Sequence, residues 1–523
     1  MSSFRRLVAV VLMPCLVLSG CARTLERRLV QPDESSTLDA QSPFLKVHGR
    51  DGRTWVLSNW SVDESARLVL GTGRLLDAHR QSIETGRFEI PLDGVVLFET
   101  NVARTHGSVA ALAVLTGISV AITIACASNP KACFGSCPTF YVADGEEQVL
   151  VAEGFSSSIA PSLEQSDIDA LHAVRAPRGM LEVAMRNEAL ETHVVRHVDL
   201  LAVQRGVRGR VFATSDGTFW QAERVLEPIA CSAVEGDILD AVRATDGYER
   251  FSSTDSTNLA QRETLEIEYA HVEPGQYGLV IASRQSLVST YLLYQTLAYM
   301  GRSAGEYIAQ LARGDPWIRE RLKATGRALG TIEVLVQNAD GAWGVAGHTA
   351  ETGPLATDVR IVPLPATPAS TTLRLRLRMT RGYWRIDALH LARLDKRVQP
   401  LRLHPAMVTR DGVEDHEAHA RLVDSQRTLV TLPGDEYVLG YALPEEPARY
   451  ELFLESRGYY LEWMRQEWLA EESPEWAAQM FLDPAKALRR LAPQFKKVEA
   501  EMEAMFWGSS YGGKKLGTTA DVR

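Results

Sequence analysis

The sequence predicts an α+β fold class with several domains, in which β-rich modules dominate and helices are concentrated in a few segments. Short runs of alternating apolar and polar residues recur at 44–57, 180–214 and 372–379, and they indicate half-buried strands. Helix start signals are found at Asp315-Pro316, Ser473-Pro474-Glu475 and Asp483-Pro484. With 523 residues, 45% of them hydrophobic, the chain can fill several cores.

Residues 1–20 have the layout of an export signal. A basic pair at 5–6 precedes an apolar run at 7–18, which is too short for a bilayer core that needs about 20 residues. The run ends in Leu-Ser-Gly-Cys at 18–21. This arrangement resembles the lipobox of bacterial lipoproteins, in which the cysteine is acylated and becomes the mature N-terminus. An ordinary secretory signal with an incidental cysteine is the alternative.

The lipobox resemblance implies that Cys21 carries lipid and holds the protein on a membrane, since several acyl chains anchor stably where one binds marginally. Ala22 follows Cys21. Aspartate there would resemble an inner-membrane retention signal, so we expect the outer membrane, with the protein facing the periplasm. Residues 21–43 are polar and rich in Ser, Asp and Gln, which predicts a flexible tether.

Beyond the tether, residues 44–105 predict a small β domain that opens with a hairpin around the turn at 49–52. Residues 108–127 then contain no charged side chain and are long enough to span a membrane. Their small and β-branched residues favour a hydrophobic helix over 106–128 that is buried or covered by a partner. A membrane span is the alternative.

Residues 129–284 predict a β-rich central domain with two distinctive segments. They read SNPKACFGSCPTFY at 128–141 and AEGFSSSIAPSLE at 152–164. Together with the lipobox, they resemble a family of uncharacterised bacterial lipoproteins in which a cysteine-rich segment, a β-hairpin and a serine-rich loop follow in this order. The resemblance extends to YYLEW at 459–463. No activity is established for that family, so the resemblance implies no catalytic residue.

Four further segments complete the predicted organisation. Residues 285–330 are helical, because apolar residues fall at helical spacing and Asp315-Pro316 opens a second helix. Residues 331–447 return to strand alternation and predict a β-sandwich-like domain. Residues 448–507 predict C-terminal helices, and the glycine-rich residues 508–523 predict a disordered tail.

Four cysteines besides Cys15 and the lipobox cysteine are candidates for disulfide bonds. They are Cys126, Cys133, Cys137 and Cys231. An exported location favours disulfides, although the sequence leaves their pairing open. Zinc bound through Cys133 and Cys137 is the less favoured alternative, because no histidine pair has matching spacing nearby.

Histidine and carboxylate side chains form two weak candidates for a metal site. His416, Glu417 and His419 form the densest cluster of side chains that can bind a metal ion. Their spacing differs from that of a helical zinc motif, so we expect a solvated loop there. His193 and His197 lie in a predicted strand, where residues four apart are roughly 13 Å apart, too far for one metal. We expect an exposed charged face there and no metal site.

The serine-rich segment 154–158 invites comparison with a nucleophile elbow, but it lacks the final glycine of that motif. A hydrolytic serine also needs a histidine and an acid in space, and His172 and Asp169 are the nearby candidates. Hydroxyls that satisfy backbone groups in a loop are the favoured interpretation. We assign no catalytic residue.

Alternating arginines and two neighbouring aromatics form the last candidates. Arg374, Arg376 and Arg378 could make a cationic stripe for anionic glycans or lipid headgroups, although a solvated sheet face is favoured. Tyr383 and Trp384 could stack on sugars, although a core position is the default for tryptophan.

The net charge of −10 and the lack of a basic stripe make nucleic acid an unexpected partner. No phosphate loop or dinucleotide motif is evident, so we expect no cofactor. The favoured function is a lipid-anchored cell-envelope protein with a non-enzymatic binding or assembly role toward a protein or glycan partner. The alternative is an envelope hydrolase, possibly metal-dependent.

Replacing Cys21 by Ser removes the thiol that would carry the acyl chains. Metabolic labelling with a palmitate analogue is expected to mark the wild type and the control Cys15→Ser, and to be lost completely in Cys21→Ser. Labelling that persists in Cys21→Ser would show that Cys21 is not the lipid attachment site.

Overall fold

The computed structural model describes residues 23–508, except 31, 50–52, 77–81, 106–136, 146, 175–176, 178, 190, 207–208, 306, 309–315, 339, 350–352, 367–369, 433 and 463–465. The fold is mostly β-sheet, with 49% strand and 23% helix, so the predicted α+β class with a hydrophobic helix is wrong. The segment predicted as that helix, 106–128, lies outside the described residues. Within the described part of the chain, no helix combines the length and apolar character that crossing a membrane requires.

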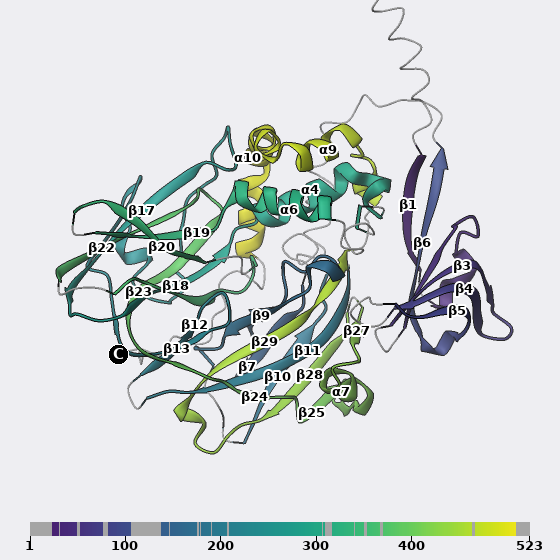
Figure 1. The fold of residues 1–523 in the computed structure, drawn as a ribbon, viewed down its shortest axis with the longest axis horizontal. Coiled ribbons are helices and arrows are strands. Elements are labelled where there is room, and N and C mark those ends of the chain that lie inside the picture. Colours follow the sequence, from purple (N-terminus) through teal and green to yellow (C-terminus); the bar gives the residue numbers. More distant parts are fainter. Residues whose placement is uncertain are drawn as a thin grey trace, which may run out of the picture.

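The N-terminal sheet is antiparallel and has its own core (Figure 1). Its strands occur in the order β1-β6-β2-β3-β4-β5. Leu45, Val47, Leu57 and Val69 are fully buried in it. The elements are β1 (Arg23–Val30), η1 (Pro32–Thr37), β2 (Leu45–Gly49), β3 (Thr54–Asp63), β4 (Leu68–Leu76), β5 (Ser82–Pro91), η2 (Leu92–Gly94) and β6 (Val95–Thr105).

The sequence predicts a flexible tether over residues 21–43, but residues 23–30 belong to this sheet. Residues 23–30 form β1, which pairs with β6 along its whole length, from Arg23 opposite Thr105 to Val30 opposite Phe98. Because a strand's backbone groups gain their hydrogen bonds from the neighbouring strand, even a polar segment is ordered when it pairs in this way.

A first sandwich packs two antiparallel sheets face to face. Their orders are β26-β25-β28-β10-β7-β8 and β24-β11-β29-β9, with β27 also paired to β11. Apolar side chains from both sheets share one core, including Phe140, Val183, Val198 and Leu454. The strands are β7 (Thr139–Asp144), β8 (Glu147–Glu153), β9 (Gln165–Ala170), β10 (Met180–Arg186), β11 (Glu191–Gln204), β24 (Leu401–Leu403), β25 (Met407–Arg410), β26 (Val413–Glu414), β27 (Leu429–Thr431), β28 (Glu436–Ala442) and β29 (Tyr450–Glu462).

A second sandwich is inserted into the first between β11 and β24. In one of its sheets, β12, β13, β23, β18 and β21 pair in a closed ring that β16 extends; the other has the order β15-β14-β17-β22-β19-β20. The strands are β12 (Arg210–Ala213), β13 (Phe219–Leu226), β14 (Ala230–Ala233), β15 (Gly236–Asp237), β16 (Arg250–Phe251), β17 (Arg262–Val272), β18 (Tyr277–Gln285), β19 (Ile332–Gln337), β20 (Trp343–Thr349), β21 (Asp358–Pro363), β22 (Ser370–Thr380) and β23 (Trp384–Val398).

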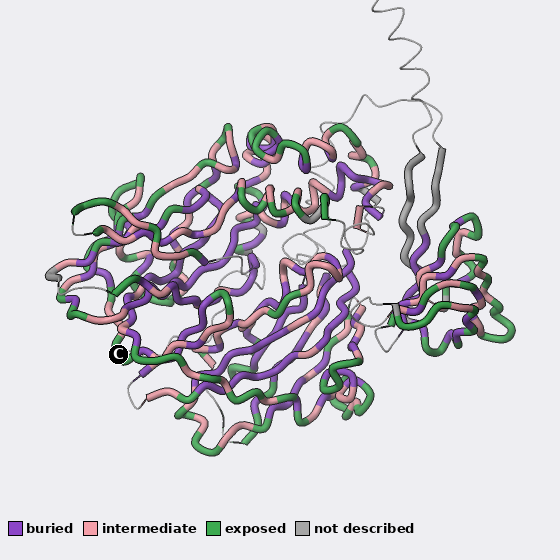
Figure 2. The backbone as a smooth tube through the Cα atoms, in the orientation of Figure 1, coloured by how far each residue is buried: buried purple, intermediate pink, exposed green. Residues whose placement is uncertain are grey.

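Because of this insertion, residues 129–284 and residues 331–447 do not form the two separate domains that the sequence predicts. Each of those segments contributes strands to both sandwiches, because strands distant in sequence complete the same sheets. Figure 2 shows buried backbone running through the strands of both sandwiches.

Helices cover one end of the second sandwich, and their apolar faces join its core. The helices expected within 285–330 are confirmed, as are the starts at Pro474 and Pro484. Residues 450–462, however, belong to the predicted C-terminal helices and instead form β29, which is almost continuously buried between β11 and β9. These helices are α4 (Val288–Met300), α6 (Pro316–Leu329), α8 (Gln466–Leu469), α9 (Pro474–Leu482) and α10 (Pro484–Gly508). Helix α7 (His416–Val423) packs against the first sandwich instead. Short helical turns are η3 (Pro161–Leu163), η4 (Leu239–Ala241), η5 (Gly301–Ser303) and η6 (Pro447–Arg449).

A cluster of charged side chains joins the two sandwiches where β9 meets β21. The backbone N–H of Ala170 donates to Asp358 Oδ1 at 3.0 Å, and Arg360 pairs with Asp358 and, at 3.3 Å, with Asp167. Asp169 is buried beside them, and burial, followed by the charges of Asp167 and Asp358, raises its pKa well above the usual range. Its carboxyl group therefore keeps its proton where an exposed aspartate would be ionised.

Replacing Asp169 by Asn should reduce the pH dependence of stability. Because the folded state raises the pKa of Asp169, the wild type loses stability as pH rises from the unfolded pKa toward the folded one, whereas Asn cannot ionise. We expect Asp169→Asn to gain about 1 kcal/mol or more relative to the wild type between pH 4 and pH 7, measured by urea unfolding. The exposed control Asp240→Asn should show no such gain, and equal pH profiles for Asp169→Asn and the wild type would refute this role.

Candidate functional site

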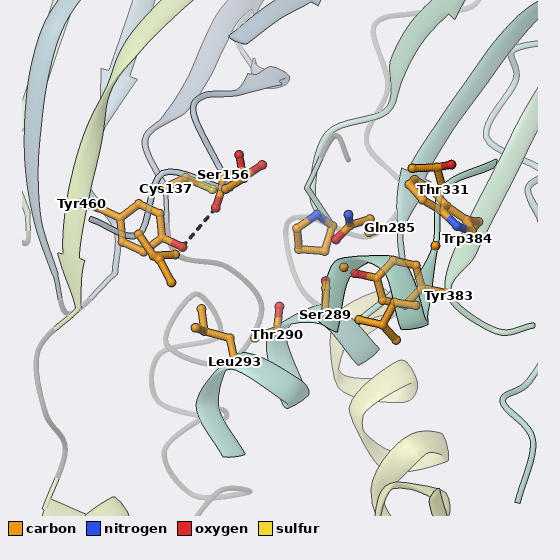
Figure 3. Close-up of a pocket in the computed structure, with 16 residues that line it drawn as sticks. Cys137, Ser156, Gln285, Ser289, Thr290, Leu293, Thr331, Tyr383, Trp384 and Tyr460 are labelled. Carbon is orange, nitrogen blue, oxygen red and sulfur yellow. Dashed lines mark hydrogen bonds between the residues drawn. The ribbon is translucent and has the colours of Figure 1, made fainter. Parts of the chain in front are cut away.

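A cavity of about 420 Å³ lies between the two sandwiches. In Figure 3, Cys137, Ser156 and Tyr460 lie on one side of it, and Gln285, Tyr383 and Trp384 lie on the other. The first sandwich also contributes Ser157 and Ile159. The helices contribute Ser289, Thr290 and Leu293 from α4 and Gly326 and Leu329 from α6, and loops of the second sandwich contribute Gly330, Thr331 and Pro354.

Three of the segments that carry the lipoprotein resemblance meet at this cavity. Cys137 comes from the cysteine-rich segment, Ser156 from the serine-rich loop, and Tyr460 from the C-terminal motif on β29. The hydroxyl of Tyr460 donates to the carbonyl of Ser156 at 3.1 Å, and the backbone N–H of Tyr460 donates to the carbonyl of Ser158 at 3.0 Å. The loop and the strand are therefore bound together at the wall.

The backbone at the start of the serine-rich loop, at Gly154 and Phe155, has little conformational freedom. Phe155 has a φ of 36°, in the left-handed region that non-glycine residues rarely adopt, and its ring is buried with an edge contact to His193. A Cβ at Gly154 would lie 2.4 Å from Ser456 Oγ and 2.8 Å from the ring of Phe140. Glycine is therefore required where the loop leaves β8, and the buried Phe155 ring anchors the serines after it.

Glu153, the last residue of β8, connects the two sandwiches beside the cavity. Its fully buried carboxylate accepts a hydrogen bond from the thiol of Cys137 at 2.8 Å and from the backbone N–H of Leu355 at 2.7 Å. Cys137 belongs to the first sandwich, and Leu355 belongs to the loop before β21 in the second. One carboxylate thus joins both walls.

The aromatic wall is positioned by hydrogen bonds at the ends of β18 and β23. The backbone N–H of Ser286 donates to the carbonyl of Tyr383 at 2.9 Å, and the Ser286 hydroxyl donates to the carbonyl of Gly382 at 2.6 Å. The rings of Tyr383 and Trp384 pack edge to face, with centroids 5.4 Å apart. Tyr383 is 8% exposed and Trp384 only 1% exposed, so both are core side chains, and the core position expected for the tryptophan is confirmed.

The described lining contains no Asp, Glu, His, Lys or Arg side chain. It combines serine, threonine and tyrosine hydroxyls with one amide, Gln285, and with apolar side chains. Such a lining can exchange hydrogen bonds with a neutral molecule, but these residues supply no carboxylate or imidazole base. The sequence did not reveal Gln285 or Thr331 as site residues, because only the insertion topology brings them to the serine-rich loop.

The metal candidates lie elsewhere and do not converge. His416, Glu417 and His419 are on helix α7 rather than in the expected loop. His416 is 81% exposed, Glu417 pairs with Arg421 and with Arg427, and the His419 ring is hydrogen-bonded to the carbonyl of Pro405. Among the described residues, no group of three or more His, Cys, Asp or Glu side chains could hold a metal ion.

The face predicted to be exposed around His193 and His197 is largely buried. His193 Nε2 lies 2.6 Å from Glu191 Oε1, and both side chains are inaccessible to solvent. Asp199 is also buried, while His197 is partly exposed and lies 3.7 Å from Glu455. The prediction failed because β11 lies inside a sandwich, where charged residues are buried in pairs.

The catalytic candidates near the serine-rich loop do not assemble. The ring of His172 is hydrogen-bonded to the carbonyl of Val211 and packs edge to face against Phe212 and Phe453. Burial, followed by the charge of Arg210, lowers the pKa of His172 to about 3. Neither His172 nor Asp169 lines the cavity with Ser156.

The arginine stripe is neutralised by its neighbours. Each of Arg374, Arg376 and Arg378 forms an ion pair, with Glu268, Glu266 and Glu333 respectively. The favoured prediction of a solvated sheet face is confirmed, since these side chains are substantially exposed.

The disulfide prediction can be followed only in part. Cys137 and Cys231 are buried, and no disulfide joins two cysteines within the described residues. Burial raises the pKa of the Cys231 thiol to about 12. Cys126 and Cys133 lie outside the described part, as does the lipid attachment residue Cys21.

No protein-family model and no curated protein matches this chain. Among solved structures, it is similar to the GH31 alpha-xylosidase from Xanthomonas citri at 8% identity and a TM-score of 0.14, covering 83% of this chain and 38% of that one. A second similarity is to the structure of infectious bursal disease virus Gt strain, at 8% identity and a TM-score of 0.13, covering 91% of this chain and 92% of that one. TM-scores of this size support no shared fold.

Replacing Glu153 by Gln should weaken the connection between the sandwiches. An amide oxygen can accept one of the two hydrogen bonds, but its NH₂ group faces the other donor. We expect a loss of about 1–3 kcal/mol in the free energy of unfolding, measured by urea denaturation. The exposed Glu182→Gln on β10 is the control and should change it by less than about 0.5 kcal/mol. Equal stability of the two variants would contradict the role given to Glu153.

Proposed function

We propose that this protein is a lipid-anchored component of the cell envelope, held at the outer membrane through Cys21 and facing the periplasm. Its role is to bind a small ligand in the cavity between the two sandwiches, without chemical conversion of that ligand. The resemblance of its motif segments to bacterial lipoproteins supports the location, and the cavity supports the binding role.

The observation that carries this proposal is the meeting of the motif segments at an uncharged cavity. Cys137 and Ser156 flank the β7–β8 hairpin and Tyr460 is distant in sequence, yet the three form one wall. A volume of about 420 Å³ lies within the range of roughly 300–1,000 Å³ that is typical of small-molecule sites. Such sites combine apolar and aromatic walls with a few polar groups, as this cavity does.

A hydrolase receives less support from the same geometry. Acyl transfer by serine needs a base within hydrogen-bond reach, and the described cavity lining offers Ser156 no histidine or carboxylate. The metal-dependent version is not supported either, because among the residues that the structure describes no group of ligands converges around His416 and His419. Binding therefore remains the favoured role.

Filling the cavity should abolish ligand retention. Thr331 is half-buried at the cavity wall, and a tyrosine there would occupy the space. We expect native mass spectrometry of the full-length protein, extracted gently from intact envelopes, to show a bound small molecule on the wild type and none on Thr331→Tyr. The control Thr264→Tyr, on the exposed face of β17, should retain it.

Two results would contradict this function. One is a folded Thr331→Tyr protein with the same bound masses as the wild type. The other is labelling of Ser156 by a fluorophosphonate probe, because only an activated serine reacts with that reagent, and it would favour the hydrolase instead.

A further inference from the structure

We infer that Gln285 is the residue that recognises the ligand, and that the ligand presents an amide edge, with an N–H donor and a C=O acceptor side by side. The rest of the ligand is uncharged and mainly apolar, so a small lactam or primary carboxamide is the class that fits. This inference rests on the proposed binding role and names the residue and the chemistry on which that role depends.

The side chain of Gln285 is buried, yet it has no partner in the protein. It is 3% exposed and lines the cavity, and in Figure 3 its amide points into the space between the two walls. Within the described part of the chain, no group forms a hydrogen bond with this amide. Because a buried amide without a hydrogen bond costs free energy, the group requires a partner from outside the chain.

The strand that carries Gln285 fixes its direction. Gln285 is the last residue of β18, where it pairs with Trp384, and its backbone N–H donates to the carbonyl of Gly353 at 2.9 Å. Consecutive strand residues point to opposite faces of the sheet. The neighbouring Arg284 accordingly pairs with Glu249, at 2.9 Å, away from the cavity. A neutral amide is therefore presented to the cavity without the adjacent charge.

Most other polar groups of the lining already have partners within the protein. Hydrogen bonds inside the protein engage Cys137, Ser156, Ser157, Ser289 and Tyr460. Thr331 is only half-buried, so water can reach its hydroxyl. A ligand with many hydroxyl groups would find few free partners here, which disfavours a sugar.

The remaining lining matches an apolar, uncharged body. Carbon surface comes from Ile159, Leu293, Leu329 and Pro354, and no charged side chain occurs among the described lining residues. An ionised ligand would leave water without meeting an opposite charge, and a very polar one would leave its groups unsatisfied. The ligand therefore concentrates its polar groups at the point that Gln285 contacts.

The geometry of a carboxamide selects that polar group. The C=O and one N–H of Gln285 lie side by side, an arrangement with which glutamine makes two parallel hydrogen bonds to one planar partner. A lactam or a primary carboxamide presents the complementary pair on one edge, so both hydrogen bonds can form at once. A trans peptide group has its N–H and C=O on opposite sides and can form only one of them.

Saturation-transfer NMR on the full-length protein in a zwitterionic detergent tests this chemistry with matched probes. The amide probes are cyclo(Leu-Gly) and hexanamide; the comparison probes are their fully N-methylated forms, which keep the C=O but lack the N–H, and cellobiose. We expect transfer from at least one amide probe and none from the comparison probes. Gln285→Met keeps the side-chain volume but removes the amide, so it should weaken binding at least about tenfold. The exposed Gln148→Met is the control and should leave binding unchanged.

The stability of Gln285→Met separates recognition from a structural role. Because Gln285 gives up no hydrogen bond to the described protein, its replacement by Met should leave the urea midpoint of the ligand-free protein equal to that of the wild type or higher. A lower midpoint would show that the amide supports the fold instead, and would overturn the inference.

The binding outcomes distinguish the inference from the proposed function. Equal binding of the methylated probes, equal binding by Gln285→Met, or no transfer from either amide probe overturns the assignment to Gln285 and an amide edge. If native mass spectrometry in those cases still finds a small molecule on the wild type and none on Thr331→Tyr, the cavity binds another class and the proposed function stands. If it finds none on the wild type, the proposed function fails as well.

Discussion

The buried carboxylate of Glu153 is the interaction on which the candidate site depends most. It is fully buried and accepts one hydrogen bond from Cys137 in the first sandwich and one from Leu355 in the second. A buried carboxylate with fewer partners would be strongly destabilising, so both donors must remain in place. Together with the ion pairs where β9 meets β21, this side chain therefore helps to hold the two walls of the cavity at a defined separation. The serine-rich loop comes directly after Glu153, which links its conformation to this connection.

Elsewhere at the interface between the two sandwiches, the buried charged side chains form ion pairs with one another away from the cavity. Asp167, Asp358 and Arg360 compensate one another where β9 meets β21, and Arg284 pairs with Glu249 beneath the end of β18. Because these buried charges have partners outside the cavity, the lining itself can be neutral. For the same reason, residues that the sequence suggested as metal or anion-binding candidates, such as His193 and the arginines of β22, form ion pairs within the fold and do not line the cavity.

Several features were predictable from local sequence, and others were not. Helix starts at Pro474 and Pro484 are local signals, because proline and a preceding polar residue act within one turn. Residues 450–462 were predicted as helix because a strand buried on both faces lacks a period of two. The insertion of one sandwich into the other depends on pairings between distant strands, which no local pattern encodes. The motif segments could be recognised, but their meeting with Gln285 and Thr331 results only from that topology.

The central claim is that a small neutral ligand occupies the cavity between the sandwiches in the intact envelope. The most direct measurement places a photo-reactive diazirine amino acid of about the size of leucine at Leu293, which lines the cavity, or at Leu482, which is 55% exposed on α9. After irradiation of intact envelopes, intact-protein mass spectrometry should find a discrete low-mass adduct on the Leu293 protein and none of that mass on the Leu482 protein. The account would be contradicted if the Leu293 protein carried no adduct, or if the same adduct formed at both positions.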